Sequence, residues 1–114
     1  MRIVKGLIAM FDSIATLVSE RIDFDELGNE KIITAEKQIF CNKKSVNQSE
    51  FFKASEAGLK PQLMILIFAV DYNNESKVKV DDKVYYIYRS YQKTKDKLEL
   101  YLSTKLVDGV QNEY

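Results

Sequence analysis

The chain has 114 residues, which is enough for one domain with a single core but too few for two ordinary domains. Its 17 basic and 17 acidic side chains balance, so no overall charge draws it onto nucleic acid or an anionic membrane. Histidine is absent and Cys41 is the only cysteine, which excludes a His/Cys metal cage, an internal disulfide and any nucleophile that needs a histidine base.

The beginning of the chain is basic and then apolar, as in a signal peptide. The apolar patch over 6–11 is short, however, and no small-residue cleavage site follows Asp12. We therefore expect a soluble, intracellular-type protein. The expected organisation is an N-terminal extension over 1–10, one domain over 11–108 and a C-terminal tail over 109–114.

Alternation of apolar and polar residues predicts two long strands, over 13–24 and 31–41, joined by an acidic loop. Gly28 and Asn29 suit a turn with positive φ in that loop. On the first strand we expect one shared face for Ile14, Thr16, Val18, Ile22 and Phe24. On the second strand we expect one shared face for Ile33, Ala35, Ile39 and Cys41.

The period then changes to that of a helix, predicted over about 48–57. Asn47 is the expected N-cap, and Glu50 stands where it can complete a capping box. Gly58 fits the left-handed position after the last turn, and Pro61 prevents continuation. The apolar side of this helix is expected to contain Phe51, Ala54, Ala57 and Gly58.

Four further strands are predicted over 63–70, 77–80, 84–91 and 98–106. The run over 63–70 is apolar on both faces and far shorter than a membrane span, so we expect a central strand or one covered on its second side by the helix or by a neighbouring subunit. The predicted fold is mainly β: a small antiparallel β-barrel or sandwich of about six strands with one short inserted α-helix.

No pattern supports catalysis or a cofactor. The carboxylates Asp23, Asp25, Glu26, Asp81 and Asp82 lie in polar turns, and the first three lack the frame of a calcium loop. No glycine-rich phosphate motif occurs. We therefore assign no catalytic, cofactor-binding or metal-binding residue, and we expect no enzyme.

Two kinds of surface remain open. Residues 37–60 contain five basic and two acidic side chains, and Tyr85, Tyr88 and Arg89 offer strand aromatics beside a cation. Together these features allow a small-barrel module that binds single-stranded nucleic acid. Alternatively, the surplus of apolar residues indicates a protein interface. The candidate subunit-interface residues are Phe51, Phe52, Tyr85 and Tyr88, and the candidate DNA-facing residues are Lys43, Lys44 and Lys53.

The order and spacing of several short pieces resemble bacteriophage head–tail connector proteins of the head-closure, or head-completion, type. The pieces are Lys44-Ser45-Val46, Ser49-Glu50-Phe51, residues 54–61, Asp71-Tyr72-Asn73, residues 84–91 and Glu99-Leu100-Tyr101. With the opening FDSIATLVSE, the similarity covers about residues 11–106. Two positions depart from the family pattern: Phe11-Asp12 stands where members often have Trp-Asp, which makes Met10 a possible start, and Asn74 stands where they usually have glycine.

The resemblance implies a β-barrel-like, non-enzymatic protein that assembles as a homo-oligomeric ring beneath the portal and adaptor ring. Such a ring closes the DNA exit channel after packaging and presents a docking surface for tail proteins. Its expected location is the head–tail interface of the virion, with assembly in the host cytoplasm. Double-stranded DNA would pass without sequence specificity, no membrane is involved, and the acidic 23–31 and basic 42–50 segments are the candidate closing loops.

Overall fold

The structure is a computed structural model that describes residues 11–105. The expected extension over 1–10, the end of the domain over 106–108 and the tail over 109–114 lie outside the described residues. The elements are β1 (Ser13–Phe24), β2 (Glu30–Lys44), α2 (Gln48–Glu56), β3 (Pro61–Phe68), the 3-10 turn η1 (Ala69–Asp71), β4 (Lys77–Val80), β5 (Lys83–Gln92) and β6 (Lys97–Ser103).

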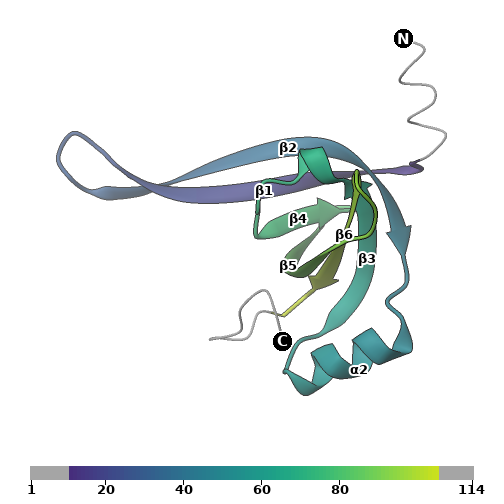
Figure 1. Cartoon of the computed structure of the whole chain (residues 1–114). Helices are drawn as coiled ribbons and strands as arrows, with labels where there is room; N and C mark the ends of the chain where they lie inside the picture. Colours follow the sequence, from purple (N-terminus) through teal and green to yellow (C-terminus); the bar gives the residue numbers. More distant parts are fainter. Residues whose placement is uncertain (1–10, 106–114) are drawn as a thin grey trace, which may run out of the picture.

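The six strands form one closed antiparallel sheet in the order β1-β2-β3-β6-β5-β4 (Figure 1). The ring closes because β1 pairs with β2 along its whole length and with β4 over Ala15–Val18. Closure leaves the body of the sheet without the two free edges that an open sheet would expose. The predicted mainly β fold, with six strands and one short helix, is confirmed.

Apolar side chains of all six strands meet inside this closed sheet. The interior cluster consists of Ala15, Leu17, Ile39, Cys41, Ile65, Ile67, Val78, Val80, Tyr85, Ile87, Leu98, Leu100 and Leu102. The predicted shared face of Ile39 and Cys41 is therefore correct. The residues predicted to share one face of 13–24 do so along the unbroken strand, but that face points outward: the odd-numbered Ala15 and Leu17 lie in the interior, while Ile14, Ile22 and Phe24 are exposed.

A second apolar cluster lies outside the sheet, under α2. It consists of Ala54, Leu59, Met64, Tyr88 and Tyr101, with Val46 and Ala57 packed against it. The helix therefore covers the outer face of β3, as the two-sided apolar run over 63–70 predicted. Because both faces of β3 and β6 are buried, these strands are the best-protected part of the fold.

The turns use the residues that tolerate positive φ. Gly58 has φ +88°, and Asn74, in the position where glycine was expected, has φ +61°. Asp81 and Asp82, at φ +52° and +66°, form the two-residue connection between β4 and β5. Positive φ at both central residues is the requirement of a type I′ hairpin turn.

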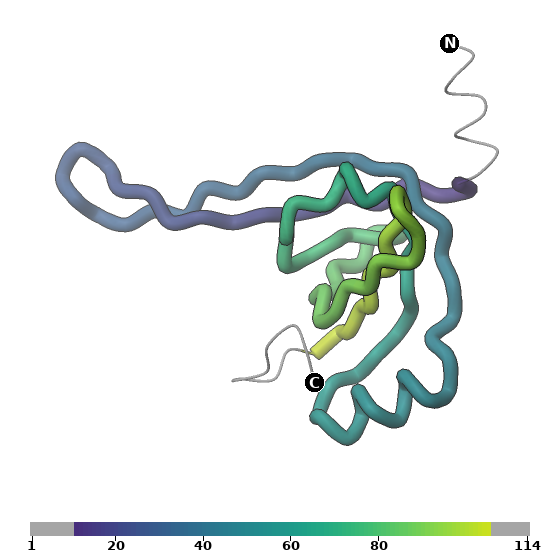
Figure 2. The backbone as a smooth tube through the Cα atoms, viewed as in Figure 1, coloured from purple at the N-terminus to yellow at the C-terminus, as the bar shows by residue number. Residues whose placement is uncertain are grey.

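The β1–β2 hairpin is much longer than the sheet that it belongs to. Figure 1 shows it running far to the left of the other four strands, while α2 lies at the lower right. The tube in Figure 2 follows the same path as one continuous, gently twisted ribbon. The hairpin thus gives a compact closed sheet one long projection.

Candidate protein-interaction surfaces

The projection begins where β1 leaves β4. Pairing of β1 with β4 covers Ala15–Val18, and pairing of β2 with β3 covers Asn42–Lys44. Among residues 11–105, the segments beyond these points pair with each other and with no third strand; we call residues 19–35 the arm. At 3.3–3.4 Å per residue, the stretch from Ser19 to Phe24 extends about 17 Å beyond the body.

One face of the arm is apolar at its outer end. Ile22 is paired with Ile32 across the ladder, Phe24 lies two residues further out, and Leu27 is in the loop. Their side chains are 63%, 70%, 61% and 86% exposed, respectively. These four residues, which we call the tip patch, are four of the ten large apolar side chains that are exposed among residues 11–105.

The loop that carries Leu27 is held by its own hydrogen bonds. The Asp25 carboxylate accepts the N–H groups of Leu27 and Asn29 at 2.9 and 2.8 Å, and Gly28 has φ +83°. Backbone hydrogen bonds from Asn29 and its neighbours lower the pKa of Asp25. The segment predicted as a long acidic loop is thus a short, ordered turn, and the strands extend to Phe24 and Glu30.

Ion pairs hold the root of the arm against β4. Lys77 Nζ lies 3.2 Å from Glu20 Oε1, and Lys79 Nζ lies 2.9 Å from Glu36 Oε2. Because these pairs are partly exposed, each contributes at most about 1 kcal/mol to stability. They help to orient the base of the arm and leave the tip patch uncovered.

The outward side of α2 carries a second exposed apolar pair. Phe51 and Phe52 are 46% and 57% exposed, and their rings meet edge to face with centroids 6.1 Å apart. Lys53 beside them is also exposed. These three residues form the helix patch. Phe51 was predicted on the inward side of α2, which is wrong: that side is occupied by Glu50 and Ala54.

The inward side of α2 is fixed by a buried polar contact. Glu50 accepts hydrogen bonds from Tyr88 Oη at 2.9 Å and from Arg89 Nη2 at 2.6 Å. The Arg89 guanidinium lies 4.2 Å from the centre of the Tyr101 ring. Burial, together with the bond to Glu50, raises the pKa of Tyr88. This cluster anchors the helix to β5 and β6, so the helix patch is held at a fixed place on the surface.

The predicted caps of α2 are present. Asn47 Oδ1 accepts the Glu50 N–H at 2.8 Å. At the other end Gly58 N–H donates to Ser55 O and Leu59 N–H to Ala54 O, the two bonds of a Schellman motif. The Glu50 side chain was expected to complete a capping box. Its carboxylate accepts hydrogen bonds from Tyr88 and Arg89 on β5.

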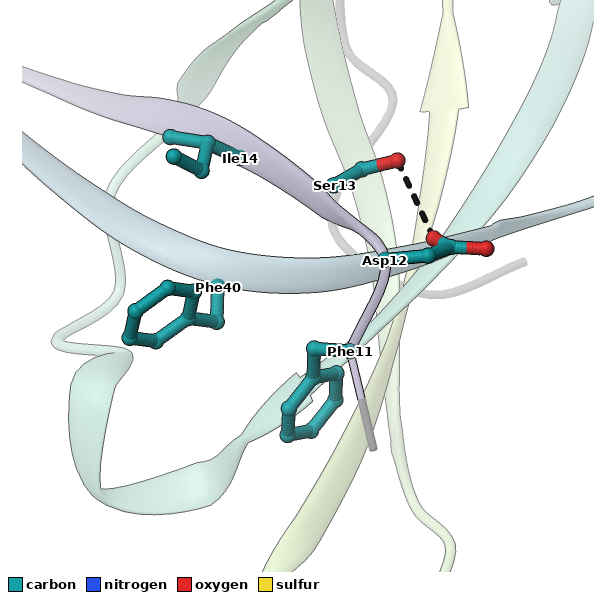
Figure 3. Close-up of a pocket in the computed structure, with 5 residues that line it drawn as sticks. All are labelled: Phe11, Asp12, Ser13, Ile14 and Phe40. Carbon is teal, nitrogen blue, oxygen red and sulfur yellow. Dashed lines mark hydrogen bonds between the residues drawn. The ribbon is translucent and has the colours of Figure 1, made fainter. Parts of the chain in front are cut away.

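A shallow apolar hollow of about 580 Å³ lies at the root of the hairpin. Figure 3 shows Phe11, Ile14 and Phe40 on one side of β1, while Asp12 and Ser13 point the other way and share a hydrogen bond. Phe11 is itself buried, with its ring 4.6 Å from that of Phe68. Exposed Ile14 and half-buried Phe40 make the accessible wall of this hollow.

The three candidate DNA-facing lysines differ in their surroundings. Lys43 Nζ lies 2.8 Å from Asp81 Oδ2, and this hydrogen bond raises the pKa of Lys43. Lys44 and Lys53 are exposed. Lys43 thus links β2 to the β4–β5 turn, whereas Lys44 and Lys53 are available for contact.

Two candidate interface residues need correction. Tyr85 points into the closed sheet and Tyr88 packs under α2, where a register shift between Ile87 and Arg89 interrupts the β5–β6 ladder. Both side chains are buried within one chain. Neither can therefore form a subunit interface or a stacking surface for bases without unfolding part of the domain.

Sequence reasoning missed the tip patch. The available signal was Leu27, an apolar residue in an acidic turn, together with Ile22 and Phe24 on the strand face opposite Ala15 and Leu17. Within residues 11–105 no group of histidine, cysteine or acidic side chains is arranged to hold a metal ion. The same part of the chain contains no helix that is long and apolar enough to cross a membrane.

In comparisons with known proteins, no protein-family model and no curated protein matches this chain.

Proposed function

We propose that this protein is a structural, non-enzymatic subunit of a bacteriophage head–tail connector ring. The ring closes the DNA exit channel after packaging and provides the docking surface for the tail. Copies of the chain contact one another, the portal or adaptor ring on one side and tail proteins on the other. The subunit is made in the host cytoplasm and becomes part of the virion at the head–tail interface.

The observation that carries this proposal is the arm with its tip patch. A two-stranded ribbon that leaves its sheet is marginally stable by itself in water. Here it also exposes Ile22, Phe24, Leu27 and Ile32 to solvent. Contiguous exposed apolar side chains on a projecting element are typical of a surface that a protein partner covers. An assembly subunit accounts for such an element, whereas an isolated catalytic domain does not.

The charge distribution is compatible with a channel component. Basic and acidic residues are equal in number, and Lys43 and Lys79 are paired with carboxylates. A protein that contacts few phosphates releases few counterions, so it holds duplex DNA weakly and lets it slide. This behaviour suits double-stranded DNA that passes without sequence-specific contacts.

The alternative, a module that binds single-stranded nucleic acid, loses its supporting residues. Tyr85 and Tyr88 are buried, and Arg89 bonds to Glu50. Base stacking needs aromatic faces at the surface. No feature of the described residues favours this alternative over an assembly role.

The test uses DNA-filled, tailless heads from the phage or prophage whose genes flank this one. We expect the purified protein to bind at the portal vertex, seen by electron microscopy, and to protect the packaged DNA from nuclease. The variant Ile22→Ser/Phe24→Ser should protect less, while the control variant Lys95→Ser, in the β5–β6 turn, should protect fully. Failure of the unaltered protein to bind heads or protect their DNA would overturn the proposal.

A further inference from the structure

We propose that the tip patch of one copy packs on the helix patch of the next copy, an inference that rests on the proposed assembly role. The partner is a second copy of this chain. The contact is heterologous: two different surfaces of the same molecule meet, and each copy offers one to each neighbour.

The two patches lie in segments of opposite net charge. Residues 21–31 contain two basic and four acidic side chains, so the tip is negative. In the segment 44–60, which contains the helix patch, the exposed charges are mostly positive: Lys44, Lys53 and Lys60 against Glu56. The other acidic residue of this region, Glu50, is buried against Arg89. Opposite charges around two apolar centres favour their encounter and their register.

The two patches also have side chains that are typical of protein interfaces. The tip patch consists of Ile, Leu and Phe side chains, and the helix patch presents two phenylalanine rings in edge-to-face contact. Protein interfaces have apolar and aromatic centres with charged residues at the rim. Each of the two surfaces has this arrangement, and in both the charges flank the apolar side chains.

The two patches lie far apart within one molecule. The arm and α2 lie at opposite ends of the molecule in Figures 1 and 2, and a separation seen in projection can only underestimate the true one. The ladder of β1 with β2 is continuous from Ser13 to Phe24, so the arm does not fold back to its own helix. Contact between the patches must therefore join two molecules. Repeated head-to-tail contacts give a ring when the rotation closes.

The hollow of Ile14 and Phe40 is the competing receptor for the tip. It is apolar, and the described residues that line it include Asp12 but no lysine or arginine (Figure 3). It therefore offers no positive charge to the acidic turn. A contact between the tip and this hollow is the alternative outcome of the trapping experiment.

The experiment is disulfide trapping between two differently marked proteins. Glu26→Cys marks the tip, Gln48→Cys marks the exposed side of α2, and Gln38→Cys marks the hollow. Each substitution preserves the apolar side chains of its patch. Cys41 is buried and its pKa is raised to about 11, so it does not compete for exchange at neutral pH.

On mild oxidation of equimolar mixtures, we expect the pair Glu26→Cys with Gln48→Cys to give a mixed dimer, identified by mass spectrometry of the linked peptides. The pair Glu26→Cys with Gln38→Cys should give only the background of random collision, set by Glu26→Cys with Lys95→Cys. A dominant link from the tip to the hollow, or equal links to every site, would overturn the proposal.

A charge exchange provides a second readout. Glu26→Lys/Glu30→Lys and Lys44→Glu/Lys53→Glu should each weaken self-association about two- to fivefold, measured by sedimentation, and the protein with all four changes should recover. Absence of recovery would contradict the pairing. If the unaltered protein binds heads but neither test succeeds, the helix patch is wrong as the receptor while the connector role stands.

Discussion

Gly58 ends α2 with φ +88°, a conformation that side chains with a branched β-carbon resist strongly. Its N–H and that of Leu59 close the last turn on Ser55 O and Ala54 O. We predict that Gly58→Val lowers the free energy of unfolding by about 1–2 kcal/mol or more. Gly58→Asn should cost less, because asparagine tolerates the left-handed region. Urea denaturation followed by circular dichroism measures both, and equal stability of the valine variant and the original protein would contradict the cap.

Cys41 is fully buried in the interior cluster, and burial raises its pKa from 9.0 to about 11. The unfolded chain ionises near pH 9, whereas the folded chain keeps its proton until about pH 11. The contribution of the neutral thiol is therefore fully present below pH 9 and is lost between pH 9 and pH 11. The loss amounts to about 2–3 kcal/mol.

We predict that the free energy of unfolding of the original protein declines more steeply between pH 9 and pH 10 than that of Cys41→Ala. Tyr101, whose pKa is raised to about 12 by burial and by its bond to Glu99, adds a decline at higher pH in both proteins. Parallel curves for the two proteins between pH 9 and pH 10 would show that the thiol is not shielded.

At the scale of elements, local signals predicted α2 well and β1 only in part. The caps of α2 are set by neighbours in sequence, so Asn47 and Gly58 sufficed to place both ends. The limits of β1 and the shared face of its even-numbered residues agree with the prediction, but the sequence pattern does not say which face points inward. Apolar side chains occur on both faces over residues 14–18, and the inward face is selected by pairing of Ala15–Val18 with β4, more than fifty residues away in sequence. Long-range pairing of this kind leaves no local trace.

The same reasoning explains the two tyrosines. Alternation correctly put Tyr85 and Tyr88 on a strand, but it does not say which face of β5 a helix covers. That face is set by the contact between Glu50 and Tyr88, residues that are 38 positions apart. The interaction surface was thus misplaced because exposure depends on tertiary contacts, which composition does not contain.

One substitution in each part of β1, both to alanine, separates the role of the body from that of the arm. Leu17 is buried in the body and Ile22 is exposed on the arm. We predict that Leu17→Ala lowers the free energy of unfolding by about 2–5 kcal/mol, whereas Ile22→Ala changes it by less than about 0.5 kcal/mol. Thermal denaturation of both variants at one low protein concentration measures the two changes. A large loss for Ile22→Ala would place the arm within the folding unit.

At the scale of the whole molecule, the closed sheet and the arm have opposite characters. The sheet buries its side chains on both faces of β3 and β6, and the arm buries almost none. A contact between the acidic tip and the basic helix region depends on salt, because exposed charges are screened within about 10 Å at 0.1 M ionic strength.

We predict that self-association measured by sedimentation weakens as salt rises from about 0.05 M to about 0.5 M and then levels off, because burial of the apolar patches is not screened. The variant Ile22→Ser/Phe24→Ser should lose the plateau while the salt dependence persists. Association that strengthens steadily with salt would show that apolar contact acts alone and that the charges play no part.

Because the arm contacts its own body only at the root, the residues that determine folding and those of the tip are different sets. Substitutions at Ile22, Phe24, Leu27 or Ile32 escape the selection that preserves the interior cluster. A lineage can therefore diversify its tip while keeping the same closed sheet. Related chains should differ most at the arm, and any change that persists there should be matched by a change in the surface that receives it.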